Sequence, residues 1–397
     1  MKIKLCLLAV FILTACKKEV KSIGDANIEV FVNTNIYFDM GFKDGSKQLN
    51  DSILRLDAGR VIIKKVKLPN YNKQTKVIVN AMLTSNGDPW DKGGSLFVIP
   101  KTATLNLIDF ESGKFDIKNF NKTYPAVKAI DSLKYQPNLE LIRFMTPFGV
   151  GHFTNDERVV KRKPPYIPHW ENEVKWSQDI TQLLQLLEDE VYIGVYIDTW
   201  TKEGYTISVN LKFNESEIPN NIKKEQTVLS LINTSKYASG QRMYDDFSRQ
   251  PLEVEFSANK TYKNAKLYFT TTGHGGHAEG DEFVKKEHQL YLDKKNIKTW
   301  IPWRDDCASF RRFNPTSGTW KAKEFMEDTT SEDMIASSDL SRSNWCPGSQ
   351  VFPEVILLGD LQKGKHTLKI AIPEAQIGTE NENNYWMVSA YIVYDNE

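Results

Sequence analysis

Residues 267–293 read LYFTTTGHGGHAEGDEFVKKEHQLYLD, a loop rich in glycine, histidine and acidic residues between two apolar runs. The flanking runs, residues 267–269 and 290–292, have the composition of short β-strands. Glycine lets the backbone adopt positive φ or approach a ligand closely, so the segment predicts a shaped loop that joins two strands. An acidic surface loop with glycines for turning is the alternative that this stretch alone leaves open.

The rest of the chain has the composition of a folded protein with more than one domain. Of its 397 residues, 40% are hydrophobic and 11% are aromatic, which is enough for a substantial core. Lys plus Arg and Asp plus Glu each number 51, so the formal net charge is zero. Proteins that bind nucleic acid normally carry a basic excess, and the balance therefore argues against a nucleic-acid partner.

The first sixteen residues predict export. Lys2 and Lys4 precede an apolar run, residues 5–13, which is too short to span a bilayer and is typical of a signal peptide. The sequence LTAC at residues 13–16 resembles a bacterial lipobox, which implies cleavage before Cys16 and lipidation of its thiol. An ordinary signal peptide that contains a chance cysteine is the alternative.

We therefore expect a lipoprotein at the cell surface or on the periplasmic face of the outer membrane. Residues 1–15 would be the signal peptide and residues 16–26 a tether. No later segment is apolar enough to be a membrane helix. Attachment to the outer membrane would then depend on the lipid.

The cysteines support an exported protein. Cys6 would leave with the signal peptide and Cys16 would carry the lipid, so Cys307 and Cys346 remain as a pair. In an exported protein we expect these two residues to form a disulfide. Closing so long a loop stabilises a fold by roughly 3–4 kcal/mol when the stabilisation is attributed to chain entropy.

Residues 27–213 consist of short β-branched and aromatic runs separated by turn formers, and we expect a first domain there. The runs include residues 28–32, 61–68, 76–83, 94–99, 140–146 and 192–199. Their spacing favours an antiparallel sandwich over alternating strands and helices. Residues 180–187, with Ser177 or Asp179 as a cap, have the spacing of a helix, and residues 157–168 predict an exposed excursion.

A polar segment, residues 214–226, predicts a domain linker. Strand-like runs resume over residues 227–397, which we expect to form a second domain. They include residues 228–233, 252–256, 266–271, 288–292, 354–358, 366–372 and 386–393. Residues 300–351 predict a long aromatic-rich loop, and such loops in compact domains are usually functional.

Two acids in the first domain stand where chemistry is plausible. Asp91 lies in the turn-rich sequence NGDPWDK, where Trp90 could stack on a sugar and Asp91 could act as a base. Asp198 follows a strand that reads as buried, and a carboxylate there tends to have a raised pKa or a charged partner. Taken alone, Asp91 is more commonly explained as a surface aspartate in a turn, and for Asp198 a hydrogen-bonded aspartate at a strand end is the alternative.

Taken in order, the motifs of this chain resemble those of the peptide-N-glycosidase F family. The first half contains Trp90-Asp91, RFMTPF at residues 143–148 and YIDTW at residues 196–200. The second half contains GHA at 276–278, residues 282–288, Cys307, GTW at 318–320 and RSNWCPG at 342–348. The similarity runs from about Asn27 onward, and WCPG after an arginine and an upstream cysteine is its most specific part.

The resemblance implies an all-β amidase with two adjacent eight-stranded antiparallel jelly-roll sandwiches. Its substrates would be N-glycoproteins or N-glycopeptides. The bond cleaved would join the asparagine side chain to the first N-acetylglucosamine, giving an aspartate-containing peptide and a glycosylamine. The resemblance implies no metal or other cofactor, and a monomer.

The resemblance also assigns roles to individual residues. Asp91 would be the principal catalytic residue, with Glu282 and Asp198 as further catalytic acids. The substrate-binding residues would be Trp90, Trp200, Arg342, Trp345 and His277. Arg342 would hold a carboxylate ionised or stabilise an oxyanion, while Trp200 and Trp345 would form apolar floors for the sugars. Acids on two domains predict a cleft at the domain interface.

The chain departs from the family pattern at three places. Asp198 stands where the family has glutamate, so this carboxylate is one methylene shorter. The small disulfides that flank the two acid loops in the family are absent, and the loops must be held in another way. Glu279 and Asp281 stand close to Glu282, which leaves the assignment of the second-domain acid ambiguous.

Two other function classes remain open on the sequence. One is a copper enzyme related to peptide-hydroxylating monooxygenases, built on His274, His277 and His288. Against it, His152 and His169 are isolated, so the first domain lacks a matching set of ligands. The other is a surface protein that binds N-glycans and has lost amidase activity, a hypothesis that rests on Asp198 and the missing disulfides.

Overall fold

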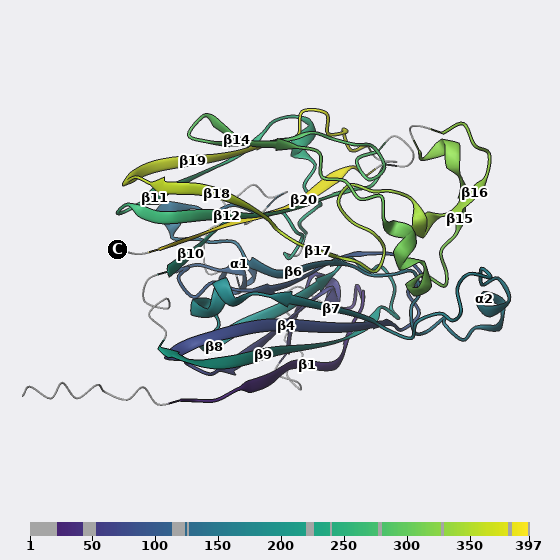
Figure 1. Ribbon diagram of the computed structural model, residues 1–397, viewed down its shortest axis with the longest axis horizontal. Helices are drawn as coiled ribbons and strands as arrows, with labels where there is room; N and C mark the ends of the chain where they lie inside the picture. The colour runs from purple at the N-terminus through teal and green to yellow at the C-terminus, as the bar shows by residue number, and fades with distance from the viewer. Residues whose placement is uncertain are drawn as a thin grey trace, which may run out of the picture.

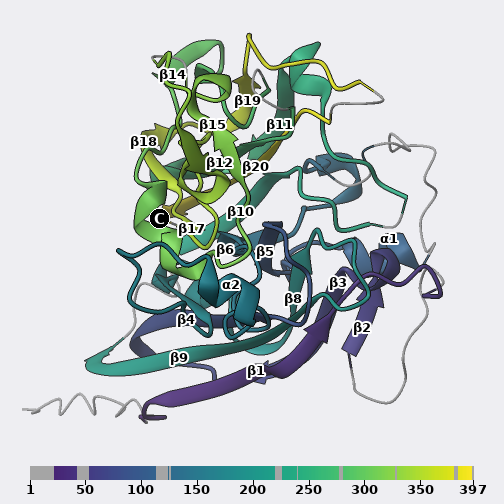
Figure 2. The same ribbon diagram turned by 90° about the vertical axis from the view of Figure 1, so that its right-hand side faces the viewer.

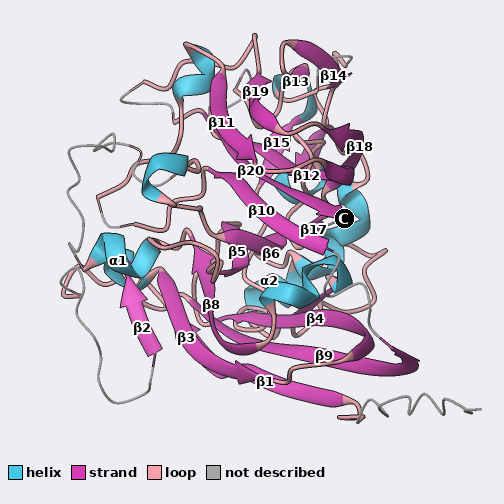
Figure 3. Cartoon of the chain, turned by 90° about the vertical axis from the view of Figure 1, so that its left-hand side faces the viewer, coloured by secondary structure: helices cyan, strands magenta, loops and turns pink. Residues whose placement is uncertain are grey.

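The computed structural model describes residues 22–42, 53–112, 124, 127–219, 226–238, 240–276, 280–326, 329–379 and 383–395. The predicted signal peptide, the lipidation site Cys16 and the predicted sugar-binding residue His277 lie outside the described residues. Figure 1 shows two stacked layers, one from each half of the chain, and Figure 3 shows that strands dominate both of them. No helix among the described residues is long and apolar enough to cross a membrane.

The first half of the chain forms a sandwich of two antiparallel sheets. One sheet has the order β1 (Ala26–Ile36), β9 (Tyr205–Pro219), β4 (Lys73–Ser85), β7 (Val174–Asp179). The facing sheet has the order β17 (Gln350–Val351), β6 (Leu139–Met145), β5 (Gly93–Val98), β8 (Asp189–Ile197), β3 (Val61–Leu68), β2 (Ile53–Leu56). Two short helices, α1 (Leu107–Glu111) and α2 (Glu157–Lys161), lie in its connections.

The second half forms another antiparallel sandwich. Its first sheet has the order β10 (Gln226–Asn233), β20 (Tyr385–Asp395), β12 (Tyr262–His274), β18 (Glu354–Leu361). Its second sheet has the order β11 (Leu252–Ala258), β19 (Gly364–Ala371), β13 (His288–Leu292), β14 (Lys295–Trp300). A separate hairpin consists of β15 (Thr319–Lys321) and β16 (Met334–Ala336).

The predicted fold class is confirmed, with one difference in the number of strands. The second sandwich has the eight predicted strands, whereas the described part of the first half contributes nine strands, β1 to β9, and borrows β17. The additional strand, β2, pairs with β3 and forms the edge of its sheet. Strand β9 continues to Pro219, which pairs with Lys73. The sheet therefore extends into residues 214–219, the first part of the predicted linker.

The predicted helix at residues 180–187 is a short 3-10 helix, Thr181–Leu186, instead of an α-helix. The Oδ1 atom of Asp179 accepts hydrogen bonds from the N–H (3.0 Å) and the hydroxyl (2.6 Å) of Thr181. The segment has only a few residues between β7 and β8 in which to bury its leucines. Short 3-10 helices are common connectors between strands, and this one buries Leu183, Leu184 and Leu186.

The alternation of apolar and polar residues along the strands gives each sandwich its hydrophobic core, and strand β20 contributes residues to both cores. In β4, Val77, Val79, Ala81 and Leu83 are buried while the residues between them are partly exposed, which is the period of a half-buried strand. Strand β20 is different because nearly all of its residues are buried. One of its faces belongs to the core of the second sandwich, and Tyr391 on the other face packs into the core of the first.

A buried ion pair fixes the interface between the sandwiches. Arg143 on β6 donates to Glu140 Oε1 (2.8 Å), and it also donates to Thr272 Oγ1 and to the carbonyl of Met387, each at 2.9 Å. Ser389 on β20 donates to Glu140 Oε2 at 2.5 Å. Strand β17 also adds to the edge of β6, as Figure 2 shows. Loops from the two sandwiches are therefore held in a constant relation to each other.

Candidate active site

Acids from the two sandwiches meet at one arginine. Asp91 lies in the loop between β4 and β5, and Glu282 lies in the loop between β12 and β13. Arg342 donates from Nε to Glu282 Oε1 (2.8 Å), and its Nη2 lies 3.8 Å from Asp91 Oδ2. The side chains of Asp91 and Glu282 are 19% and 17% exposed, whereas that of Arg342 is 1% exposed. The two carboxylates are therefore partly open to solvent, while the guanidinium of Arg342 between them is buried.

Arg342 is fixed by its own surroundings. Its Nη1 donates to the carbonyls of Ser337 (2.7 Å) and Leu340 (3.0 Å). Its guanidinium also lies 4.9 Å from the ring centroid of Phe283. Because the guanidinium is buried and these contacts occupy it, the predicted substrate contact of Arg342 is corrected: this residue holds the two carboxylates.

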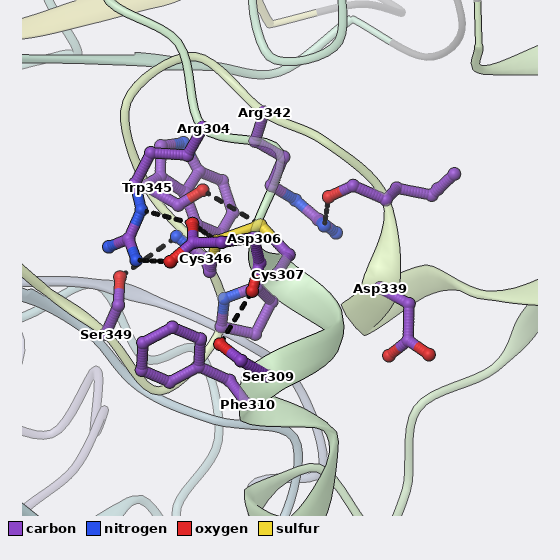
Figure 4. Close-up of a disulfide and its surroundings, with 12 residues drawn as sticks. Arg304, Asp306, Cys307, Ser309, Phe310, Asp339, Arg342, Trp345, Cys346 and Ser349 are labelled. Atoms are coloured by element: carbon purple, nitrogen blue, oxygen red, sulfur yellow. Dashed lines mark hydrogen bonds and ion pairs between the residues drawn. A yellow bond between two sulfur atoms is a disulfide. The ribbon is translucent and has the colours of Figure 1, made fainter.

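Trp345 supports the arginine from below. Its ring lies 4.8 Å from the guanidinium of Arg342, its Nε1 donates to the carbonyl of Gly273 (2.8 Å), and it is 3% exposed. The prediction that Trp345 forms a floor for the sugar is wrong, because no face of its ring is open. The predicted disulfide between Cys307 and Cys346 is confirmed, and Figure 4 shows it beside Trp345 and Arg342.

Two of the predicted aromatic residues do have open faces. Trp90 is 57% exposed and Trp200 is 56% exposed. The main chain of Trp90 is fixed because its carbonyl accepts a hydrogen bond from the Tyr205 hydroxyl (2.6 Å). Trp200 packs against Phe38 with the ring centroids 5.3 Å apart. Rings that are held in this way can stack on the apolar face of a sugar.

Burial tunes the first-domain acids. Burial raises the pKa of Asp91 to about 6; the positive charge of Arg342 opposes this rise and the negative charge of Glu282 adds to it. A carboxylate with a pKa near neutrality is suited to general base catalysis. Burial also raises the pKa of Asp198, and the positive charge of Arg60 opposes that rise. The N–H of Asp198 donates to the carbonyl of Gly93 (3.0 Å), which connects it to the segment after Asp91.

Hydrogen bonds hold the Trp90-Asp91 loop where the family has a disulfide. Asp88 is buried, and its two carboxylate oxygens accept from the Trp90 N–H (3.0 Å) and the Thr199 hydroxyl (2.7 Å). Thr199 directly follows Asp198, so Asp88 links the two acid loops of the first sandwich. Thr316 from the second half of the chain donates to the carbonyl of Pro89 (2.6 Å).

A similar set of bonds holds the loop that carries Glu282. The neighbouring Asp281 is buried: its N–H donates to Asn384 Oδ1 (3.0 Å) and its Oδ1 accepts from the Gln376 N–H (2.9 Å). Its carbonyl accepts from the Ser343 hydroxyl (2.6 Å). Asp281 therefore points into the protein while Glu282 faces Arg342. Of these two neighbours, Glu282 is the acid of the site; Glu279 lies outside the described residues.

Asp281 is expected to make the stability depend on pH. Burial raises its pKa from 3.8 to about 6, so the folded state binds this proton more tightly than the unfolded state does. Ionisation then destabilises the fold by roughly 3 kcal/mol, and this stability is lost as the pH rises from about 4 through about 6. In Asp281→Asn, we expect the change in the free energy of unfolding between pH 4.5 and 7.5 to differ from wild type by about 2 kcal/mol, because part of the effect is already present at pH 4.5.

Urea denaturation at the two pH values measures this difference. Asp305→Asn, at an exposed aspartate, serves as the matched control and is expected to follow the wild-type curve. The assignment fails if Asp281→Asn and wild type lose or gain the same free energy between the two pH values.

The two described histidines of the glycine-rich segment have structural partners. His274 Nε2 lies 2.7 Å from Thr272 Oγ1, and His288 Nε2 lies 3.0 Å from Thr271 Oγ1. Burial lowers the pKa of His288 to about 3 and that of His274 well below its usual value, so both are neutral. They belong to different sheets. Within the described ranges, no three His, Cys, Asp or Glu side chains cluster so as to hold a metal ion.

Several residues around the acids carried no signal in the sequence. Asp88 lies within the motif of Asp91, but its partner Thr199 is 111 positions away. Arg60 precedes β3, and its Nη1 lies 3.6 Å from Asp198 Oδ1. Lys236 follows β10 in the other sandwich and adds a second positive charge near Asp198. Only an alignment or a structure could have connected these positions.

Comparisons with known proteins agree with this geometry. Residues 27–213 match the family described as "Peptide-N-glycosidase F, N terminal", and residues 243–393 match "Peptide-N-glycosidase F, C terminal". Two crystal forms of PNGF-II are each 36% identical with a TM-score of 0.79, and the matches cover 94% of this chain. This chain spans 66% and 65% of the length of those PNGF-II chains.

More distant relatives share the fold. PNGase F, a glycosylasparaginase from Flavobacterium meningosepticum, is 15% identical with a TM-score of 0.56, and the match covers 94% of this chain and 96% of that one. No curated protein sequence matches the chain. The two family matches together span most of the chain, in the order that the motifs predicted. The chain therefore belongs to the peptide-N-glycosidase F family.

Proposed function

We propose that this protein is an amidase that removes N-glycans from glycoproteins or glycopeptides. The bond hydrolysed is the one between the asparagine side chain and the first N-acetylglucosamine, and the products are an aspartate-containing peptide and a glycosylamine. One observation carries the proposal: Asp91 and Glu282, from separate sandwiches, lie at the same buried guanidinium, that of Arg342. The family relationship supports the same class of reaction.

In this reaction Asp91 is the general base. An amide is a poor electrophile, so the attacking water must lose a proton as it adds to the carbonyl carbon. With a pKa of about 6, Asp91 is ionised at neutral pH and basic enough to take that proton. The nitrogen that leaves must gain a proton, and Asp91 can return the one it has taken. This exchange gives one residue both roles in turn.

Glu282 and Asp198 complete the site. Glu282 is oriented from two sides, by Arg342 at Oε1 (2.8 Å) and by the N–H of Gly275 at Oε2 (3.3 Å). It is thereby fixed as an acceptor for the water or for the amide N–H. Asp198 is the third acid, with the open ring of Trp200 two residues further along the chain. The exposed rings of Trp90 and Trp200 provide surfaces on which the first sugars can stack.

An N-glycan-binding protein without activity is the second candidate. The observation that favours it is the pair of open tryptophan faces, which would serve a sugar-binding protein equally well. The ionised base, the second acid and the fixed guanidinium are additional features that binding alone does not require. We therefore place the amidase first.

Hydrolysis in water enriched in heavy oxygen distinguishes the two functions. A glycopeptide incubated with the protein is expected to yield a peptide with aspartate at the former glycosylation site, carrying one heavy oxygen atom from water. Mass spectrometry of the peptide measures this. A peptide that keeps its glycan would support the binding function, and a peptide that keeps one N-acetylglucosamine would contradict amide cleavage. Prior treatment with a chelator is expected to leave the yield unchanged, because the proposed roles belong to protein side chains.

For its location, we propose a lipid-anchored monomer on the outer membrane. This proposal rests on the basic start, the apolar run and the LTAC sequence of residues 1–16. A lipid on Cys16 would tether the catalytic part near the membrane, either at the cell surface or on the periplasmic face. Glycoproteins in the surroundings are the substrates that a surface orientation would offer.

A further inference from the structure

Asp198 belongs to a group of four charged side chains from both sandwiches, together with Asp57, Arg60 and Lys236. Arg60 donates from Nη2 to Asp57 Oδ1 (2.9 Å), and its Nη1 lies 3.6 Å from Asp198 Oδ1. Lys236, which follows β10, places its Nζ 3.5 Å from Asp57 Oδ2. The four side chains are between 4% and 15% exposed. Two carboxylates thus face two cations in a nearly dry setting, and the formal charges cancel.

Part of this group is held by charge attraction without hydrogen bonds. Arg60 Nη1, Asp57 Oδ2 and Asp198 Oδ1 are buried and have no hydrogen-bond partner. The distances of 3.5 and 3.6 Å that separate them from the opposite charges exceed the usual range for hydrogen bonds. In a setting of low dielectric, such pairs attract strongly, and the loss of one cation would leave an uncompensated buried anion.

The same cations contact the wall of a cavity beside Asp198. A cavity of about 720 Å³ is lined by residues that include Asp198, Trp200 and Lys236. The guanidinium of Arg60 lies 4.3 Å from the ring centroid of Trp200, and Lys236 Nζ lies 5.4 Å from it. Both distances suit a cation–π contact. Arg60 and Lys236 therefore act on the carboxylate and on the aromatic ring together.

Other groups around Asp198 do not replace these two cations. Lys92 lies near enough to oppose the rise in the pKa of Asp198, but its effect ranks below those of Arg60 and Lys236. Tyr196 and Tyr385 also lie near the carboxylate. Burial raises the pKa of both tyrosines well above 10, so both are neutral between pH 6 and pH 8.

We propose that Arg60 and Lys236 are positioning residues for the amidase reaction. They hold Asp198 as a carboxylate and fix the ring of Trp200 as a wall of the cavity beside it. Asp57 balances their charge. This inference rests on the amidase function proposed above. If so, the protonation state of Asp198 in the first sandwich depends on Lys236 from the second sandwich.

Lys236→Met tests the proposal through the dependence of the rate on pH. Without this positive charge, the pKa of Asp198 rises further, so a larger fraction of Asp198 is protonated in mildly acidic solution. We expect the acidic limb of the kcat/KM profile, to which Asp91 and Asp198 both contribute, to extend to higher pH, so that the loss relative to wild type is several-fold greater at pH 6 than at pH 8. Lys236→Arg restores the charge and is expected to restore the limb.

Arg60→Lys separates the two roles. The variant keeps the positive charge but removes the guanidinium plane beneath Trp200, so we expect an unchanged acidic limb and a KM that is several-fold higher. Lys65→Met is the control, because Lys65 forms an exposed pair with Glu190 (2.7 Å) away from the site. Its profile is expected to match that of wild type.

The possible outcomes bear on different claims. A Lys236→Met enzyme whose rate falls by one factor at every pH, or whose profile equals that of wild type, would overturn the positioning role. If Lys236→Met does not fold, a raised KM with an unshifted limb in Arg60→Lys supports the proposal, and an unchanged KM refutes it. If the wild-type protein releases no glycan from the glycopeptide, the proposed amidase function is wrong. This outcome differs from the outcomes for Lys236→Met and Arg60→Lys, which concern only the positioning role.

Discussion

Asp91→Asn is expected to reduce glycan release by about 10³-fold while the affinity for a glycopeptide changes only a few-fold. Asparagine has nearly the same shape and can still accept a hydrogen bond, but it cannot take a proton from water. Because Asp91 lies 3.8 Å from Arg342 Nη2 and does not anchor the loop, its replacement should leave the site assembled. Single-turnover release of a labelled glycan measures the rate, and titration of the variant with the same glycopeptide measures the affinity.

The pH profile of the wild-type protein provides a second measure of the same residue. With a pKa of about 6, Asp91 loses its base function as it is protonated, so kcat/KM should fall tenfold per pH unit below pH 6. The residual rate of Asp91→Asn should lack the part of this limb that belongs to Asp91 and keep only the part that Asp198 contributes. Asp305→Asn is the matched control and should turn over normally. Normal turnover by Asp91→Asn would end the assignment of Asp91 as the base.

Arg342→Met is expected to have the second large effect, on both stability and activity. Methionine fills part of the volume and packs between Phe283 and Trp345, but it leaves Glu282 without its 2.8 Å hydrogen bond and leaves the Leu340 carbonyl without the donor that Arg342 provides. Removing one partner of a buried ion pair costs about 3–5 kcal/mol. Without the guanidinium, the two acids also repel each other. We expect glycan release below detection and a marked fall in Tm.

Two further variants make this result specific. Arg312→Met removes an arginine that is 54% exposed and pairs with Glu171 (3.2 Å), and it should alter neither property. The double variant Arg342→Met/Glu282→Gln removes one of the two negative charges left without the arginine and should regain part of the lost stability, yet remain inactive. A single Arg342→Met variant with wild-type Tm and turnover would show that this arginine does not organise the acids.

Much of the fold could be predicted because local patterns decide it. The alternation of apolar residues in β4 and the apolar run in β20 identify strands without any knowledge of their partners. What β20 contacts could not be predicted in this way. A continuous apolar run indicates a strand that is buried on both faces but does not say what covers each face, so the position of Tyr391 at the interface required the assembled structure.

The site was predictable to the extent that its residues lie in recognisable motifs. Asp91 and Glu282 come together, and Trp90 and Trp200 stay exposed. Trp345 was misjudged because the exposure of a tryptophan depends on what covers it, and here the covering group is an arginine three residues earlier in the chain. The contacts of Asp88, Arg60 and Lys236 join distant positions and leave no pattern in the nearby sequence.

Strand β17 has a consequence for how this molecule could be divided. Gln350 and Val351 belong to the second half of the chain but complete the sheet of the first, opposite Phe144 and Arg143. Arg342 stands only a few residues before them, on the same tethered segment. The first half produced alone would therefore lose both the strand that completes its sheet and the cation beside Asp91, while the second half would keep Arg342 with Glu282 but lack Asp91. A division of the chain between the two sandwiches would separate the two acids and leave a sheet edge unpaired.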